Sequence, residues 1–112
     1  MPNNKTRKNK KNVFKKQDYH SNDGMLTSIW GPAMWHYLHS MSFNYPTLPS
    51  KQQKEEYKNF VLSLQHTLPC RKCRDNLEKN FKELPLKQEH LKNRDTFSKY
   101  IYDLHEIVNK ML

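Results

Sequence analysis

The stretch Thr27–Pro46, TSIWGPAMWHYLHSMSFNYP, combines aromatic and apolar residues at helical spacing in a chain of 112 residues. Thr27 or Ser28 is the expected N-terminal cap, Pro32 falls in the expected first turn, and Pro46 ends the segment. The large side chains fill most of a helix circumference, which predicts a largely buried helix. These side chains are Ile29, Trp30, Met34, Trp35, Tyr37, Leu38, Met41 and Tyr45.

Three further segments each carry one apolar face at helical spacing. Ser50-x-x-Gln53 has the form of a capping box, Pro69 is well placed to start a helix, and Pro85 stops it. No segment alternates in the way of a strand. The sequence therefore predicts an all-α fold, an antiparallel four-helix bundle. The expected helices after the first span residues 50–68, 69–84 and 93–112, the last beginning near Asn93 or Asp95, with residues 85–93 as a polar connection.

Charge divides the chain into two parts. The net charge is +9, and no acidic residue precedes Asp18. We interpret residues 1–25 as a disordered basic tail and residues 26–112 as the folded domain. Nucleic-acid contact by the tail, or a basic address signal in it, is the sharper alternative. The tail's basic residues are Lys5, Arg7, Lys8, Lys10, Lys11, Lys15 and Lys16.

The expected cellular compartment is inferred from two kinds of segment that the sequence does not show. The N-terminus has no apolar stretch of the secretory type, and no apolar run is long enough to span a bilayer. We expect a cytoplasmic protein without signal peptide or transmembrane segment. A stable structural disulfide is uncommon in such a reducing compartment.

The chain has two cysteines, Cys70 and Cys73, in the stretch Pro69-Cys70-Arg71-Lys72-Cys73. A C-x-x-C in a reducing compartment is more often catalytic or metal-binding than structural. Both sulfurs are expected near a helix N-terminus beside three cations, Arg71, Lys72 and Arg74, which favours the thiolate. The local chemistry thus indicates a redox dithiol.

Two other functions remain open at this point. A zinc-stabilised helical binding module needs two more ligands, which His90 and His105 can supply, although the absence of a second C-x-x-C favours a site without metal. A basic-tailed nucleic-acid-binding bundle explains the charge but does not need both cysteines. A thioredoxin-like fold is disfavoured because the βαβ context is absent.

Two pairs of residues four apart add polar groups to apolar helix faces. Trp35 and His39 form one pair, and His105 and Asn109 form the other. Core packing explains these positions from periodicity alone. A polar ligand inside the bundle also explains them, since buried polar groups need partners.

Three groups of residues, taken together, resemble the Erv/ALR family of flavin-linked sulfhydryl oxidases, most closely its members from large DNA viruses. The resemblance runs from Ile29 to Leu112. Its groups are Trp30-Gly31-Pro32-Ala33-Met34-Trp35 with His39 and Tyr45-Pro46; then Pro69-Cys70-x-x-Cys73; then Arg94-Asp95-Thr96-Phe97 with Asp103-Leu104-His105-x-x-Val108-Asn109.

The resemblance implies an FAD-dependent thiol oxidase that forms protein disulfides and passes electrons through flavin to oxygen, giving hydrogen peroxide. Cys73 would lie next to the isoalloxazine ring and attack it, and Cys70 would exchange with substrate. Protein thiols or a separate dithiol shuttle protein would be the partners. A homodimer through the first helices is also implied, and a viral member would act in the host cytoplasm or the virion.

The resemblance also implies a set of flavin contacts. Trp35 and His39 would line the flavin cavity, and Gly31 would allow close backbone approach. The adenine-nucleotide part would be held by His105, Val108 and Asn109.

Departures from the family pattern concern four features. Leu68 stands where the family usually has Tyr, and Glu106 stands where it usually has Asn. A second cysteine pair is absent, so substrate is expected to reach Cys70 directly or through another protein. The sequence stops at Leu112, before the family's Lys and short fifth helix, which implies either a minimal form or a fragment.

Overall fold

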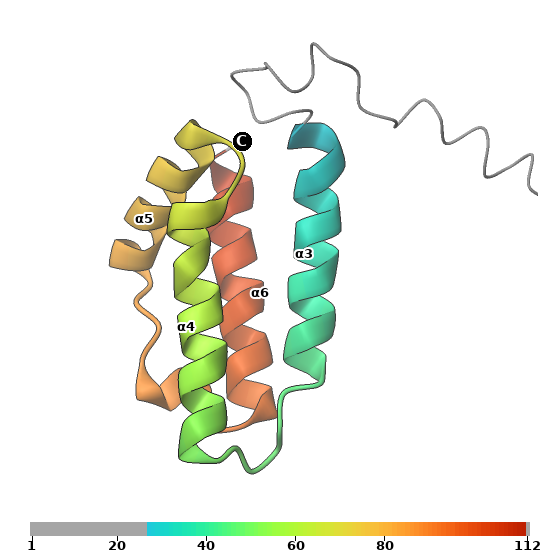
Figure 1. The fold of residues 1–112 in the computed structure, drawn as a ribbon, viewed down its shortest axis with the longest axis vertical. Helices are drawn as coiled ribbons and strands as arrows, with labels where there is room; N and C mark the ends of the chain where they lie inside the picture. The colour runs from blue at the N-terminus through green and yellow to red at the C-terminus, as the bar shows by residue number, and fades with distance from the viewer. Residues whose placement is uncertain (1–26, 112) are drawn as a thin grey trace, which may run out of the picture.

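The computed structural model describes residues 27–111, and the tail predicted over residues 1–25 lies outside this range. Within the described range the chain forms four α-helices and one short 3-10 helix, without a strand (Figure 1). The prediction of an all-α fold is confirmed. The elements are α3 (Thr27–Phe43), α4 (Lys51–Thr67), α5 (Arg71–Glu83), η2 (Gln88–Leu91) and α6 (Arg94–Lys110).

Consecutive helices run in opposite directions, as the prediction of an antiparallel bundle requires (Figure 1). α3 packs against α6, α5 packs against α4 and α6, and η2 covers the start of α6. None of the helices in the range 27–111 is long and apolar enough to cross a membrane. The most deeply buried side chains come from α3, α4, η2, α6 and the segment after α3. They are Leu38, Ser42, Tyr45, Val61, Leu91, Phe97, Tyr100, Ile101 and Leu104.

Side-chain caps fix the starts of α4 and α6. The Ser50 hydroxyl accepts a hydrogen bond from the Gln53 backbone N–H at 3.1 Å, and the Gln53 side chain accepts from the Ser50 N–H at 2.9 Å. The predicted capping box is thus present. Asn93 and Thr96 form the same reciprocal pair at the start of α6. Each box satisfies two backbone donors that a helix end leaves without partners.

Other predicted boundaries are wrong by a few residues. Thr27 and Ser28 both lie inside α3, so neither is its cap, and Pro32 lies within the helix beyond its first turn. α3 ends at Phe43 rather than at Pro46. Proline disfavours the helical conformation in the residue before it, here Tyr45. The helix ends earlier still, at Phe43. Tyr45 therefore lies in the turn after α3.

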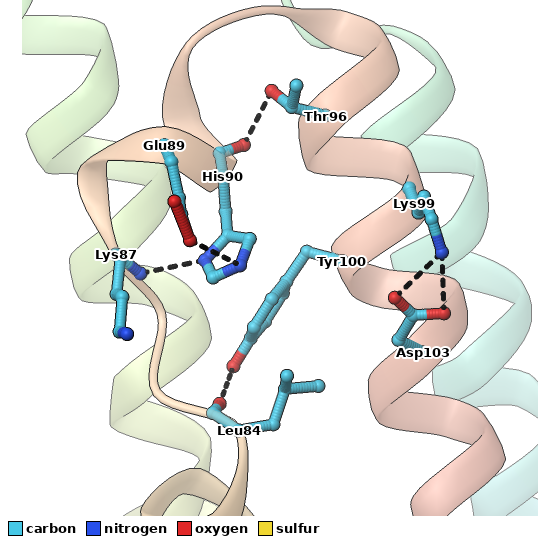
Figure 2. Close-up of polar contacts among 8 residues, drawn as sticks. All are labelled: Leu84, Lys87, Glu89, His90, Thr96, Lys99, Tyr100 and Asp103. Atoms are coloured by element: carbon cyan, nitrogen blue, oxygen red, sulfur yellow. Dashed lines mark hydrogen bonds and ion pairs between the residues drawn. The ribbon is translucent and has the colours of Figure 1, made fainter.

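The connection between α5 and α6 is not the polar loop that the sequence suggested. Leu86 and Leu91 are both buried there, Leu91 completely. Figure 2 shows how polar contacts hold the segment: the His90 ring accepts a hydrogen bond from the Lys87 N–H, and the Tyr100 hydroxyl donates to the Leu84 carbonyl. The segment binds to α6 through backbone groups, a type of contact that hydrophobic periodicity does not reveal.

Tyr45 joins three parts of the chain at the end of the bundle where α3 stops and α6 begins. Its hydroxyl donates to the Leu91 carbonyl at 2.7 Å, and its own carbonyl accepts from Arg94 Nε at 2.6 Å. The ring is fully buried and lies 4.5 Å from the Phe97 ring and 4.9 Å from the Tyr57 ring, between centroids. Burial raises the pKa of the Tyr45 hydroxyl, which keeps it a hydrogen-bond donor at neutral pH.

We predict that Tyr45→Phe lowers the free energy of unfolding by about 1–2 kcal/mol, because the buried Leu91 carbonyl loses its donor while the ring still packs. Urea denaturation followed by circular dichroism measures this change. Tyr102→Phe is the matched control, since Tyr102 is exposed on α6, and it should leave stability unchanged. Equal midpoints for Tyr45→Phe and Tyr102→Phe would contradict the prediction.

Candidate functional site

A cavity of about 680 Å³ opens between the four helices. Thr27 at the start of α3, Cys73 near the start of α5 and Met111 after α6 all line it, so it lies at the end of the bundle opposite Tyr45 (Figure 1). Most of the lining surface is apolar. Seven sequence-predicted site residues take part in this lining: Gly31, Trp35, His39, Cys73, His105, Val108 and Asn109. Cys70 does not.

Three aromatic rings from α3 and α6 form one wall of the cavity. The Trp35 and His105 rings stack at 4.1 Å between centroids, with 4° between their planes. His39 Nε2 lies 2.8 Å from His105 Nδ1, a hydrogen-bonding distance. One ring must accept and the other donate, so at least one of the two imidazoles is neutral. Burial, followed by the nearby His39, lowers the pKa of His105, which favours the neutral form there.

The two cysteines occupy different positions at the start of α5. Cys70 is the N-cap residue, and its Sγ accepts a hydrogen bond from the Cys73 backbone N–H at 3.1 Å. The helix therefore begins one residue after the cap, at Arg71, and the prediction that Pro69 starts it is wrong by two residues. Both thiols are free, with Cys70 buried and Cys73 partly exposed toward the cavity.

The expectation that both sulfurs favour the thiolate is wrong for Cys73. Burial raises the pKa of its thiol to about 12, and the neighbouring Cys70 contributes in the same direction. The Arg74 charge acts in the opposite sense but has the smallest influence. Arg74 is also engaged elsewhere, because its Nη1 donates to the Leu68 carbonyl at 2.6 Å. Desolvation of the charged form thus outweighs the cations and the helix N-terminus at this position.

Gly31 and Leu68 are also part of the lining. A Cβ placed on Gly31 would meet only Thr27 Cγ2, at 3.9 Å, so packing within the described protein does not require glycine there. Leu68 presents an aliphatic side chain at the position where the sequence departed from the family's Tyr.

One stripe of cavity residues on α5 was not among the predicted site residues. Asn76, Leu77 and Asn80 follow Cys73 at intervals of three, four and seven, and all three line the cavity with it. The same helical spacing that identified the apolar faces could have found them, counted from the cysteine. Asn80 is 3% exposed, and its side-chain Nδ2 is buried without a hydrogen-bond partner among residues 27–111.

The described residues do not assemble the ligand set that a zinc module requires. No group of three or more His, Cys, Asp or Glu residues that could hold a metal occurs in the range 27–111. His90 lies on η2, where its ring binds the Lys87 N–H, while His105 lies in the cavity and contacts His39. The two histidines proposed as ligands therefore serve separate parts of the structure.

The cavity residues suit a flat aromatic cofactor. Trp35 offers a broad ring face, and the apolar lining excludes water from a hydrophobic ring system. His39, His105 and Asn109 supply a few polar groups, and the unpartnered Asn80 amide adds another. A thiol, Cys73, reaches the same space. The residues present thus fit the flavin that the sequence resemblance implies.

Comparison with known proteins supports the family resemblance seen in the sequence. A profile of the Erv1/Alr family matches residues 32–112. A probable FAD-linked sulfhydryl oxidase of Acanthamoeba polyphaga mimivirus is 35% identical over 85 residues, covering 76% of this chain and 59% of the relative. A putative FAD-linked sulfhydryl oxidase of invertebrate iridescent virus 6 is 30% identical over 88 residues, covering 75% and 79%.

A solved structure, the FAD binding domain of Erv1 from Saccharomyces cerevisiae, superposes with a TM-score of 0.66 at 32% identity, covering 72% of this chain and 74% of that one. The chain spans 59% of the mimivirus relative's length, so the likeness concerns a domain rather than that whole protein. The profile match covers most of the sequence, including both cysteines and every cavity residue from Pro32 onward. The chain belongs to the Erv1/Alr family.

Proposed function

We propose that the protein is an FAD-dependent sulfhydryl oxidase that forms disulfides in protein substrates. The observation that carries the proposal is the meeting of a C-x-x-C thiol with an aromatic-walled cavity: Cys73 and the stacked pair Trp35 and His105 line the same space. The relatives named as FAD-linked sulfhydryl oxidases, and the yeast domain named as FAD-binding, support the same activity. Residues 26–112 would form the oxidase domain, and residues 1–25 a basic tail.

Different walls of the cavity would contact different parts of the cofactor. The flavin ring would lie against Trp35 and His39, with Gly31 allowing close approach of the α3 backbone. His105, Val108 and Asn109 on α6 would hold the adenine-nucleotide part. When bound, the flavin would supply the two-electron redox chemistry and the transfer of those electrons to oxygen, which yields hydrogen peroxide. The protein would bind and orient the flavin.

The two cysteines would act in sequence. A substrate thiolate attacks the oxidised pair at Cys70 Sγ and breaks the Cys70–Cys73 bond, so that Cys73 leaves as a thiol or thiolate. The second substrate thiolate then attacks the mixed disulfide at the substrate sulfur and releases Cys70. The substrate becomes a disulfide and the enzyme pair becomes a dithiol, with two electrons transferred. Those electrons would leave through Cys73, the cysteine that lines the cavity.

The surroundings of Cys70 support its release from the mixed disulfide in the second step. Its Sγ accepts the Cys73 backbone N–H, and this contact would be available to the sulfur that leaves. Cys70 also lies outside the cavity lining, so a cofactor in the cavity would not block it. Substrates would be protein thiols or a separate dithiol shuttle protein.

A homodimer is proposed through α3 and its neighbour α4. Tyr37 on α3 is 56% exposed and Phe60 on α4 is 41% exposed, and their rings meet edge to face at 6.1 Å. Ile29 adds a further exposed apolar side chain to α3. Burial of these side chains in a second copy would remove apolar surface from water. The viral relatives support action in a host cytoplasm or a virion.

We predict that the full chain binds FAD noncovalently and purifies yellow. Absorbance near the flavin bands, followed by denaturation and chromatography of the released cofactor, measures this. Trp35→Ala should weaken FAD binding by about tenfold or more, because the ring face that the flavin would stack on is lost. The matched control is Trp30→Ala, which removes a second indole of the lining outside the stacked pair and should cost less. A colourless protein that fails to take up excess FAD would refute the proposal.

We predict that the two cysteine variants behave differently. Cys73→Ser should abolish reduction of FAD by any thiol, whereas Cys70→Ser should show a long-wavelength absorbance band from the Cys73 thiolate beside the flavin. Cys70 is one cause of the high Cys73 pKa, so its removal lowers that pKa below about 12. The band should grow as pH rises through the remaining pKa and vanish in acid, where Cys73 is a thiol. A pH titration of the visible spectrum measures it.

Two outcomes of this experiment would contradict the assignment. If Cys73→Ser shows the band and Cys70→Ser does not, the inner and outer roles are reversed. If both variants keep full turnover of a small dithiol, the protein is not a thiol oxidase that works through this pair. Asn59→Ala is the control for purification and activity, because Asn59 is exposed on α4 and lies outside the cavity lining.

A further inference from the structure

The side-chain amide of Asn80 is a buried polar group that the fold leaves without a hydrogen-bond partner among residues 27–111. Its side chain lies among the most buried polar groups of the described chain, and Nδ2 is the atom concerned. An amide donor buried without a partner has lost its hydrogen bonds to water without replacement, which destabilises the fold. Buried polar atoms of this kind are rare, and each needs a physical explanation.

The position of Asn80 in the cavity suggests the explanation. Cys73 and Asn80 are separated by seven residues, so they lie on one stripe of α5, with Asn80 two helical turns, roughly 10 Å, farther along the axis. The Tyr100 hydroxyl binds the Leu84 carbonyl, which fixes the level of α5 relative to α6. Asn80 lies one helical turn before Leu84 on α5, and Leu104 lies one turn after Tyr100 on α6. Both steps lead toward the open end of the bundle, and both residues line the cavity.

Asn80 contributes a polar group to a cavity whose lining is mostly apolar. Leu38 from α3, Leu77 from α5 and Leu104 from α6 are buried and line the same cavity. A water molecule bound there would need two to four polar partners, and these leucines offer none. A ligand that brings its own acceptor atom would satisfy the amide instead.

We propose that Asn80 is a flavin-positioning residue, whose Nδ2–H donates a hydrogen bond to an acceptor atom of the isoalloxazine ring system when FAD fills the cavity. The proposal rests on the proposed function. Flavin rings carry carbonyl oxygens and unprotonated ring nitrogens that can accept such a bond. The amide would hold the ring in register with Cys73, which lies on the same helix face, and so set the approach of the thiol to the flavin.

This role has a consequence for redox chemistry as well as for affinity. Two-electron reduction places more electron density on the acceptor atoms of the ring, and a hydrogen bond to a more negative acceptor is stronger. Asn80 would therefore stabilise reduced flavin more than oxidised flavin. A tenfold difference between the two forms corresponds to about 30 mV in a two-electron midpoint potential.

The test compares wild type with Asn80→Leu, a substitution of similar volume that suits the surrounding leucines and removes the donor. We expect the dissociation constant for FAD, measured by fluorescence titration of the full chain, to rise about tenfold or more. We also expect the midpoint potential of bound flavin to fall. Asn80→Asp is the second variant, since it keeps the shape of asparagine but cannot donate when ionised, and it should change both quantities in the same direction.

Asn59→Leu is the matched control, because Asn59 is an exposed residue of α4 outside the cavity lining. It should leave the dissociation constant and the potential at the wild-type values. Circular dichroism at saturating FAD verifies that each variant keeps its helices.

Two results would overturn the assignment of Asn80. Wild-type affinity and wild-type potential in both Asn80 variants would show that the amide does not contact the flavin. A weaker affinity with an unchanged potential would show that Asn80 only shapes the cavity. Failure of the wild type itself to bind FAD would overturn the proposed function, and the inference with it, so the two failures are distinguishable.

Discussion

The packing of Tyr45 against Phe97, with its hydroxyl on the Leu91 carbonyl, is the constraint on which the rest of the structure depends. It connects the end of α3 to η2 and to the first turn of α6 at one end of the bundle. Arg94 adds a second link by donating to the Tyr45 carbonyl. Because this end is closed by large buried side chains, the other end can remain open around a cavity while α3 and α6 stay adjacent.

The antiparallel order of the helices determines which residues meet at the cavity. α3 and α5 begin at the open end, and α6 finishes there (Figure 1). Trp35 and His39, Cys73, and His105 and Asn109 come from three different helices and are far apart in sequence, yet all line one space. Short connections and alternating directions are sufficient to bring them together.

The sequence predicted the helices well where local chemistry determines them. The predicted capping box at Ser50 depends on residues within one turn and is present. The last helix was expected to begin near Asn93 or Asp95, and Asn93 is its cap. The prediction failed where tertiary contacts decide. Leu86 and Leu91 looked like parts of a polar connection because they are isolated among charged residues, yet the core of the bundle buries them. Helical spacing places Asn80 on the same face as Cys73, but its burial in a cavity depends on packing of three helices. The preference of Cys73 for the thiol also has a tertiary cause, since neighbouring charges are visible in a sequence and desolvation is not.

The sulfur of Cys70 also serves as the cap of α5, accepting the Cys73 backbone N–H in the place where a serine or asparagine oxygen usually stands. A thiol or thiolate can make this contact in the dithiol form, whereas a sulfur bonded to another sulfur is a poorer acceptor. The first turn of α5 is therefore held most firmly in the reduced protein. By thermodynamic linkage, whatever free energy the cap contributes favours the dithiol, so the folding of one helix turn raises the reduction potential of the cysteine pair.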